Sequence, residues 1–362
     1  DSIRIQKVTL PIGPVLVLGS SNFPLAYSTA GGDTIAAFAA GCCVLVKAHA
    51  MHAGTSVLVA ECIEDARKTL NLPEGVFTHV LDDGFQHAQR LCLDERIQAI
   101  GFTGSFKGGK ALMDLAHSRK NPIPVFAEMG SVNPVVIDEN LSSKQQETVA
   151  EKLAHSICND AGQFCTKPGV IFIPHGQTGE HFTQRLKQFI AETTAVPMLH
   201  PNIHGNFENG KTEIASISGV KFTSASIPQN GIEGRWSLAE ADVKTFIEHQ
   251  RLQEEVFGPF SLLVTYNSKE ELHTGLEALS GQLTGSIFYE THSDLVTDCI
   301  EMLSRKVGRI ILNDVPTGVR VTETMHHGGP FPASSDVRFT AVGPDSIQRF
   351  QKYVSIQQKN RT

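Results

Sequence analysis

Cys165 is the side chain in this sequence whose setting best suits nucleophilic chemistry. It lies in a glycine-bounded loop that reads Ala161-Gly162-Gln163-Phe164-Cys165-Thr166-Lys167-Pro168-Gly169. A thiolate attacks carbonyl carbons, but an ordinary thiol, with a pKa of about 8.5, is only a few per cent ionised at neutral pH. A catalytic cysteine therefore needs exposure and nearby positive charge, which this loop and Lys167 could supply, and donors for the resulting oxyanion. Taken alone, the loop favours a buried structural thiol.

The number and spacing of the cysteines argue against a metal or disulfide framework. The seven cysteines stand at positions 42, 43, 62, 92, 158, 165 and 299, and no two have Cys-x-x-Cys spacing. No metal site is expected, and a cytoplasmic, reducing location fits better than secretion. The six cysteines other than Cys165 are interpreted as small core hydrophobes.

The composition excludes several classes of partner. The 362 residues are 41% hydrophobic and 19% charged, with a formal net charge of −7. Without a basic block, the chain is not expected to bind nucleic acid or an anionic membrane. No apolar run reaches the roughly 20 residues that span a bilayer, and the first residues lack a signal peptide's apolar core. The chain begins at Asp1 rather than Met, so we expect a fragment or a trimmed protein.

Strands and helices alternate in the first third of the chain, which predicts a doubly wound parallel sheet. Strands are expected at 14–19, 42–47, 76–81, 97–102 and 125–128, and helices at 24–40, 55–72, 88–93 and 107–116. Such sheets bind ligands beyond the carboxyl ends of their strands. Here those ends carry 19–22, Lys47 and 102–105. This architecture favours a nucleotide without identifying one.

A second α/β domain is predicted from Asn133 onward, because the alternation of apolar strands and amphipathic helices resumes. Strands are expected at 135–137, 170–173, 260–266, 283–288 and 309–312, and helices at 144–158, 181–193, 269–279 and 293–304. The polar, glycine-bearing region 201–236 is left open. Gly328-Gly329-Pro330 and Phe331-Pro332 predict that the final stretch begins as an extended loop.

Six short motifs, each weak alone, occur in the order of one enzyme superfamily. They are Pro11-Ile12-Gly13-Pro14-Val15 with Ser21-Asn22-Phe23-Pro24-Leu25, then Val46-Lys47, Gly101-Phe102-Thr103-Gly104-Ser105, Glu128-Met129-Gly130-Ser131-Val132-Asn133-Pro134, Gly162-Gln163-Phe164-Cys165 and Glu254-Glu255-Val256-Phe257-Gly258-Pro259. Together, over nearly the whole chain, they resemble the aldehyde dehydrogenase superfamily. The context of Cys165 and the stretch 325–332 are most similar to the NADP-dependent subgroup that acts on fatty aldehydes and α-ketoglutaric semialdehyde.

The resemblance implies an aldehyde dehydrogenase-like α/β fold with three parts. Residues 1–129 would form a cofactor-binding domain with a parallel sheet, lacking its N-terminal part. Residues 130–326 would form an α/β catalytic domain, and 327–362 a segment that returns to the cofactor domain. It also implies a homo-oligomer, a dimer or tetramer, when full length.

The chemistry that the resemblance implies is oxidation of an aldehyde to a carboxylic acid with NAD or NADP. Cys165 would attack the aldehyde to give a thiohemiacetal, while the Asn22 amide and the Cys165 backbone N–H hold the oxyanion. Hydride transfer would leave a thioester, and Glu128 would activate the water that hydrolyses it. From the residues alone, Asn22 could equally cap a turn and Glu128 could be a solvated carboxylate at a strand end.

The cofactor-binding residues implied by the resemblance also have simpler interpretations. Lys47 would bind a ribose but could be a surface lysine after a strand. Thr103, Gly104 and Ser105 would form the phosphate-side turn, and Ser105 could simply cap the following helix, whose N-terminus favours a pyrophosphate. Glu255 would bind the nicotinamide ribose and Phe257 would pack beside the ring; both could be the rim of a tight turn.

The sequence departs from the subgroup where the 2′-phosphate of NADP would bind. The subgroup's threonine and arginine positions correspond to Ala50 and, on a loop alignment, Phe85. The glutamate of many NAD-preferring members is also absent at Ala50. Asp82 and Asp83 would repel a 2′-phosphate. We therefore predict a lean towards NAD.

Two alternatives remain open at the level of sequence. The chain could be a truncated, inactive nucleotide-binding or scaffolding protein that keeps the motifs without an assembled site. It could also be a cysteine hydrolase that uses His155, His175 or His181, although no spacing places these histidines beside Cys165. The identity of the aldehyde lies beyond the sequence.

Overall fold

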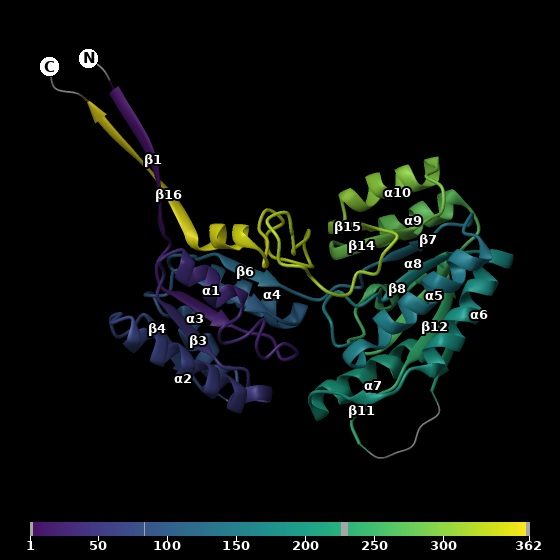
Figure 1. The fold of residues 1–362 in the computed structure, drawn as a ribbon, viewed down its shortest axis with the longest axis horizontal. Coiled ribbons are helices and arrows are strands. Elements are labelled where there is room, and N and C mark those ends of the chain that lie inside the picture. Colours follow the sequence, from purple (N-terminus) through teal and green to yellow (C-terminus); the bar gives the residue numbers. More distant parts are fainter. Residues whose placement is uncertain (1–2, 83, 226–230, 360–362) are drawn as a thin grey trace. The chain divides into compact units, whose positions relative to one another are not determined.

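The chain folds into two compact units, each with its own sheet (Figure 1). The structure is a computed structural model that describes residues 3–82, 84–225 and 231–359. Unit 1 comprises residues 1–129, 321–326 and 338–362, and unit 2 comprises 130–320 and 327–337. The first division between the units falls after residue 129. Among the described residues, no helix combines the length and apolar character needed to cross a lipid bilayer.

Unit 1 is built on a parallel sheet in the order β4-β3-β2-β5-β6. Its strands are β2 (Val15–Leu18), β3 (Val44–Lys47), β4 (Phe77–Val80), β5 (Ala99–Thr103) and β6 (Val125–Glu128). They are short, mostly buried apolar runs, as expected for a sheet covered on both faces. The strand order reverses between β2 and β5, which is where sheets of this kind bind ligands.

Helices cover both faces of this sheet, which confirms the predicted doubly wound arrangement. They are α1 (Gly32–Ala39), α2 (Ala53–Thr69), α3 (Gln86–Leu93) and α4 (Phe106–His117), with a short turn η1 (Ala50–His52). One core cluster joins β2 and β3 to α1, α2 and Phe350, and another joins β2 and β5 to α3 and α4.

The helix predicted at 24–40 is wrong over its first half. Residues 24–30 form turns, and the helix begins only at Gly32. The chain turns back on itself so tightly that a Cβ on Gly31 would lie 2.6 Å from the carbonyl oxygen of Ala26. The alanine-rich composition favoured helix, but it carried no signal for this close backbone approach.

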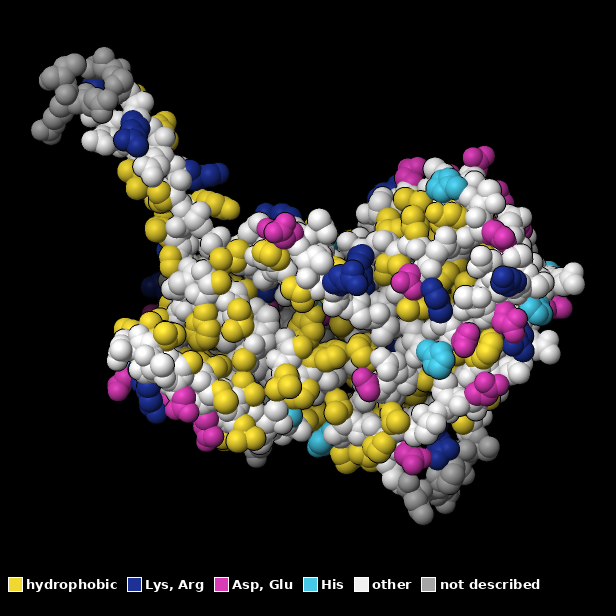
Figure 2. Space-filling model, viewed as in Figure 1, with side chains coloured by type: hydrophobic (Ala, Val, Ile, Leu, Met, Phe, Trp, Pro, Cys, Tyr) yellow, Lys and Arg dark blue, Asp and Glu magenta, His cyan; other side chains and the backbone are white. Residues whose placement is uncertain are grey.

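An antiparallel arm joins the two ends of the described chain. β1 (Ile3–Pro11) pairs with β16 (Gln351–Lys359), and the arm extends away from the unit 1 sheet (Figure 1). Apolar side chains lie along its exposed surface (Figure 2): Ile3, Ile5, Leu10, Tyr353, Val354 and Ile356. The 3-10 segment η4 (Pro344–Phe350) precedes β16, and its Arg349 Nη1 donates to Asp33 Oδ1 at 2.6 Å. This buried ion pair fastens the end of the chain to α1.

Unit 2 contains a sheet in the order β10-β12-β13-β8-β7-β14-β15, parallel except for β10. Its strands are β7 (Val135–Ile137), β8 (Val170–Pro174), β10 (Lys221–Ser224), β12 (Ser237–Asp242), β13 (Phe260–Tyr266), β14 (Gln282–Phe288) and β15 (Val307–Leu312). The predicted second α/β domain is therefore confirmed.

The unit 2 sheet is also packed on both faces. Helices α5 (Ser143–Cys158) and α6 (Gln177–Glu192) share one core cluster with β7 and β8. On the other face, Phe172 of β8 contacts Phe246 of α8 (Val243–Glu248) and packs against Gly275 of α9 (Lys269–Ala278). Helix α10 (Asp294–Ser304) leads into β15.

The region left open in the sequence, 201–236, contains helix α7 (Pro201–Ala215) and strand β10. A small ladder pairs β9 (Val196–Pro197) with β11 (Glu233–Gly234). Residues 226–230 of this region lie outside the described residues.

The predicted C-terminal part, 327–362, is divided between the two compact units, with residues 338–362 in unit 1. Residues 327–337 belong to unit 2, and 321–326 belong to unit 1 instead. The extended stretch after His327 lies against unit 2 backbone so closely that only glycine fits at the crossings. A Cβ on Gly308 would meet the Gly328 carbonyl oxygen at 2.1 Å, and one on Gly281 the Pro330 carbonyl oxygen at 2.1 Å.

Candidate active site

The loop that carries Cys165 begins with an unusual backbone turn. After α5 and the 3-10 segment η2 (Asn159–Gly162), Asp160, Ala161 and Gly162 have positive φ values of 45°, 54° and 63°. For residues other than glycine this conformation is sparsely populated and strained, and such residues cluster at functional sites. The turn sets Gly162 so close to a neighbouring loop that a Cβ there would lie 2.4 Å from the carbonyl carbon of Gly258. Cys165 itself is half-buried.

Asn133 anchors the Cys165 loop through side-chain hydrogen bonds to its backbone. Its Nδ2 donates to the carbonyl oxygens of Cys165 at 2.8 Å and Lys167 at 2.9 Å. Its Oδ1 accepts from the hydroxyls of Ser131 and Thr284, so the fully buried amide is satisfied on both sides. Asn133 adopts φ 45°, which an asparagine tolerates better than most residues. The motif 128–134 therefore contains a residue, Asn133, that positions the cysteine loop.

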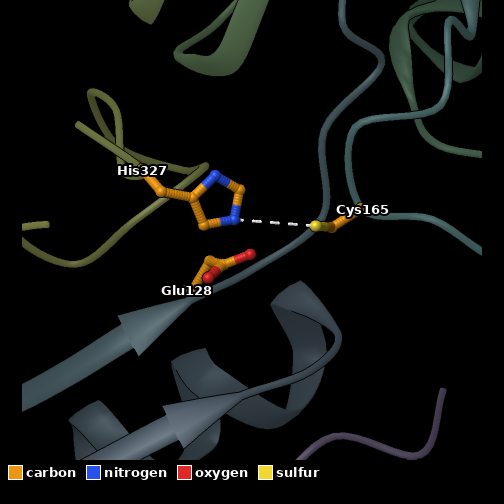
Figure 3. A group of neighbouring side chains, drawn as sticks. All are labelled: Glu128, Cys165 and His327. Atoms are coloured by element: carbon orange, nitrogen blue, oxygen red, sulfur yellow. Dashed lines mark hydrogen bonds between the residues drawn. The ribbon is translucent and has the colours of Figure 1, made fainter. Parts of the chain in front are cut away.

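His327 is the functional candidate that the sequence reasoning missed. Its Nε2 lies 3.7 Å from Cys165 Sγ, within hydrogen-bond range for sulfur, and Figure 3 shows the imidazole directed at the thiol. The ring is buried and stands on the extended stretch that crosses Gly308 and Gly281. The only local signal was a histidine before Gly328-Gly329-Pro330. A contact spanning 162 residues cannot be read from spacing.

The histidines proposed for a cysteine hydrolase have other surroundings. His181 Nδ1 pairs with Gln146 Oε1 at 2.7 Å, between α6 and α5. His155 on α5 and His175 after β8 are exposed. His327, rather than any of these three, is the histidine that the structure places beside Cys165.

Glu255 and Phe257 lie in the loop before β13, next to the Cys165 loop. The Glu255 carboxylate packs over Gly130, where a Cβ would stand 2.4 Å from Oε2. Burial raises the pKa of Glu255 to about 7, and the Lys167 ammonium opposes that rise. Gly258, at φ 147°, packs so tightly on the Phe207 ring that a Cβ would lie 2.3 Å from it. The motif 254–259 is thus a tightly packed loop as well as a candidate nicotinamide contact.

Glu128 and Asn22 belong to unit 1. Glu128 is the last residue of β6, and its backbone carbonyl accepts from the Gly104 N–H at 3.1 Å. Asn22 lies in the turn that follows β2. Both residues therefore stand at the carboxyl edge of the unit 1 sheet, where a ligand is expected.

The candidate phosphate-side turn connects β5 to α4. Thr103 ends β5, and Ser105 caps α4 by accepting the Gly108 N–H at 3.2 Å. A Cβ on Gly104 would lie 2.7 Å from the Phe102 ring, so the turn packs closely on that side chain. Ser105 therefore caps the helix, which is the simpler of its two predicted roles. The N-terminus of a helix is also a suitable place for an anion.

Lys47 and Asp82 follow neighbouring strands at the same edge. Lys47 ends β3, and Asp82 lies two residues after β4. The Gly84 N–H, donating to Oδ1 at 3.0 Å, is the main influence that keeps the pKa of Asp82 below its ordinary value, aided by His87 and Lys47. Asp82 Oδ2 is buried and accepts no hydrogen bond from a described residue. Asp83 lies outside the described residues.

The structure divides the predicted site residues between the units. Unit 2 brings together Cys165, Glu255 and Phe257. Unit 1 carries the remaining candidates along one sheet edge: Asn22, Lys47, Thr103, Gly104, Ser105 and Glu128.

Comparison with known proteins identifies relatives of the chain. The family model described as the aldehyde dehydrogenase family matches residues 3–206. Alpha-ketoglutaric semialdehyde dehydrogenase 2 of Azospirillum brasilense is 40% identical over 359 residues, covering 99% of this chain and 68% of that protein. The alpha-ketoglutaric semialdehyde dehydrogenase of Acinetobacter baylyi is 42% identical over 362 residues, covering 98% and 68%. The chain thus spans about two thirds of the length of these relatives.

Solved structures share the fold at lower identity. Betaine aldehyde dehydrogenase of Staphylococcus aureus, solved in complex with NAD+, aligns with a TM-score of 0.83 and 19% identity, covering 98% of this chain and 69% of that one. Proline utilization A of Bdellovibrio bacteriovorus aligns with a TM-score of 0.83 and 19% identity, covering 98% and 36%. From its motifs, its fold and these relatives, the chain belongs to the aldehyde dehydrogenase family, whose members oxidise aldehydes with a nicotinamide nucleotide.

Proposed function

We propose that the protein oxidises a semialdehyde or an aliphatic aldehyde to the carboxylic acid through a covalent thioester on Cys165. Two relatives at 40% and 42% identity carry the name alpha-ketoglutaric semialdehyde dehydrogenase, which supports a semialdehyde as substrate. The observation that carries the proposal is the setting of Cys165, on a loop fastened by Asn133 and facing His327 Nε2 at 3.7 Å. Family membership does not favour the inactive scaffold.

The residues of the chain divide the chemistry between them. The Cys165 thiol loses its proton towards His327 Nε2, and the sulfur attacks the aldehyde carbon to form a thiohemiacetal. The Asn22 amide and the Cys165 N–H stabilise the oxyanion; losing such a donor costs roughly 10²–10³ in rate. A bound nicotinamide supplies the hydride acceptor. Glu128 then removes a proton from the water that hydrolyses the thioester.

The unit 1 edge fits a nicotinamide nucleotide. The capped N-terminus of α4 suits a pyrophosphate, and Lys47 stands at a strand end where a ribose would lie. Glu255 and Phe257 of unit 2 would take the nicotinamide ribose and ring. We propose NAD over NADP, because the ionised Asp82 disfavours a 2′-phosphate and its buried Oδ2 could accept from a ribose hydroxyl instead.

The test is a panel of aldehydes, including α-ketoglutaric semialdehyde, assayed with NAD and with NADP by the absorbance of reduced nicotinamide. Turnover with a semialdehyde and NAD is expected. Absence of turnover with every pairing, in a folded sample, would remove the proposed function. A clear preference for NADP would remove only the cofactor proposal.

Two cysteine variants test the nucleophile. Cys165→Ala is expected to abolish turnover, whereas Cys158→Ala, seven residues earlier, is expected to retain it. Burial raises the pKa of Cys158 to about 11, so this thiol is unreactive at neutral pH. Equal losses from both variants would contradict the assignment of Cys165.

The contact with His327 gives the cysteine hydrolase a specific basis as a second candidate function. A cysteine hydrolase would hydrolyse an activated ester without any nucleotide. A dehydrogenase would show the same side activity, because an ester can also acylate its cysteine to give a thioester. Only ester or thioester hydrolysis together with a lack of nucleotide-dependent oxidation would favour the hydrolase.

We also propose that the protein assembles as a homo-oligomer, a dimer or tetramer. The apolar side chains exposed along the β1–β16 arm support this. Light scattering of the purified protein is expected to give a multiple of the 39.3 kDa chain mass. A monomer at micromolar concentration would contradict it.

A further inference from the structure

Lys167 is a buried cation that belongs to the Cys165 loop but reaches into another loop. Its side chain is 1% exposed. Its Nζ donates to the carbonyl oxygens of Phe260 at 2.6 Å and Val256 at 3.3 Å. These two carbonyls flank the turn that contains Phe257, Gly258 and Pro259. The ammonium therefore bridges the two ends of that turn from outside it.

A buried lysine loses the hydration of its ammonium, which is strongly unfavourable. An apolar side chain would therefore be preferred here if packing were the only requirement. Good hydrogen-bond acceptors only partly offset the lost hydration. The Phe260 ring, 6.0 Å from Nζ, adds a weak attraction. Sequence reasoning gave Lys167 the task of supplying positive charge to Cys165, but its hydrogen bonds are directed at the neighbouring loop instead.

The two loops interlock at a second point. Gly162, in the left-handed turn before Cys165, sits against Gly258 and Pro259, where a Cβ would lie within 2.5 Å of the backbone. The backbone contact limits how closely the loops approach, and the Lys167 hydrogen bonds keep them from separating. Together they fix the loop 255–260 relative to the cysteine loop.

The Lys167 charge also acts on Glu255. Burial lowers the pKa of Lys167 to about 8 while Glu255 raises it, and the ammonium in turn opposes the rise in the Glu255 pKa. The cation therefore favours the carboxylate form of Glu255. A carboxylate is the form that accepts hydrogen bonds from ribose hydroxyls.

We propose that Lys167 is a positioning residue that sets the loop of Glu255 and Phe257 against the cysteine loop and thereby controls the affinity of unit 2 for the nicotinamide ribose. The inference rests on the proposed function, because it takes Glu255 and Phe257 as nucleotide contacts. Lys167 itself is not assigned a contact with substrate or cofactor.

The experiment compares Lys167→Met with Lys306→Met in the intact protein. Methionine keeps the linear, apolar stem and removes the ammonium. Lys306 is the matched control, since its Nζ also donates to two backbone carbonyls of unit 2, those of Glu277 and Leu279, both at 2.9 Å. Two quantities are measured: the dissociation constant of NADH, by its fluorescence, and the rate at which iodoacetamide alkylates Cys165, by peptide mass spectrometry.

Loss of two hydrogen bonds to a charged group is expected to weaken NADH binding by roughly tenfold or more in Lys167→Met. The alkylation rate of Cys165 should stay within about twofold, and Lys306→Met should change neither quantity. A purely structural role would change the dissociation constant of NADH and the alkylation rate of Cys165 together, or change neither, and either result would overturn the proposal. If the methionine variant does not fold, Lys167→Gln, which keeps two N–H donors on a shorter stem, must bind NADH more weakly than the wild type; equal binding would overturn the proposal.

The readouts separate this inference from the proposed function. A protein that binds NADH but oxidises no aldehyde loses the proposed function, while weaker binding in Lys167→Met would still support the positioning role. A protein that turns over aldehydes but binds NADH equally with and without Lys167 keeps its function and loses the inference. A wild type that binds no NADH removes both.

Discussion

In unit 1 the candidate nucleotide-binding side chains follow the ends of neighbouring parallel strands, whereas in unit 2 the side chains around Cys165 come from loops far apart in the sequence. Lys47 is the last residue of β3, and the turn 103–105 begins with the last residue of β5. Cys165 instead depends on Asn133, 32 residues away, and His327, 162 residues away. A strand end positions a residue through the sheet itself, whereas an interlocked set of loops needs specific side-chain contacts to hold it.

The largest loss of stability is expected from breaking a distant contact within unit 1, the ion pair between Arg349 and Asp33. Arg349→Met leaves Asp33 as a buried charge without its cation, which typically costs about 3–5 kcal/mol of stability. Urea unfolding followed by hydrogen exchange of β2 and α1 measures the loss. Arg96→Met, which breaks an exposed pair with Asp94, is the control and should have little effect. Equal losses would mean that Arg349 does not hold unit 1 together.

A somewhat smaller effect is expected from the anchor of the Cys165 loop. Asn133→Ala removes the donor to the buried Cys165 and Lys167 carbonyls, which costs roughly 1–3 kcal/mol per group left unsatisfied. Turnover should fall along with stability, measured by steady-state kinetics and thermal unfolding. Asn140→Ala, a turn residue bonded to Asp138, is the control. Loss of stability with full turnover would show that the loop does not depend on this anchor.

The packing of Glu255 on Gly130 offers a narrower test. In Gly130→Ala the added methyl displaces the carboxylate, so KM for the nucleotide should rise roughly tenfold, equivalent to about 1.4 kcal/mol of binding. Iodoacetamide labelling of Cys165 should be unchanged. Gly205→Ala on α7, where an added Cβ meets no atom within 4 Å, is the control. An unchanged KM would argue against Glu255 as a nucleotide contact.

The smallest effect is expected at the unit 1 edge. Asp82→Asn keeps an acceptor for the Gly84 N–H but removes the charge, so the preference for NAD over NADP should fall by a factor of about 3 to 10. The ratio of kcat/KM values for the two nucleotides measures this. Asp65→Asn on α2 is the control, and an unchanged ratio for Asp82→Asn would remove Asp82 as a determinant.

The same contrast explains how much of the molecule the sequence could predict. The strands 125–128, 135–137 and 260–266 were predicted with the boundaries that the structure has, because short, mainly apolar runs identify buried strands. The helix at 24–40 was overextended, because the backbone crossing at Gly31 depends on residues that composition cannot place. The arm strand β16 carried no burial pattern, since its side chains are largely exposed.

For the candidate site, the motifs located individual residues but not their contacts. Cys165, Glu255 and the turn 103–105 were singled out by the order of the six motifs along the chain, because each motif alone was weak. The direction of the Lys167 side chain and the approach of His327 could not be predicted, because each depends on which distant loop packs against the cysteine loop. The roles of the site residues stay predictions until the variants above are measured.

The pairing of Asp33 with Arg349 has a consequence for synthesis on the ribosome. The two residues are 316 positions apart, so at about 5–20 residues per second Asp33 is made roughly 15–60 s before its partner. Unit 2 is complete in the nascent chain before unit 1, because residues 338–362 of unit 1 are made after the whole of unit 2. The unit 1 sheet, whose last strand ends at Glu128, must therefore persist without Arg349 and Phe350 during translation. Slow elongation beyond residue 320 would prolong the exposure of this incomplete unit to chaperones and proteases.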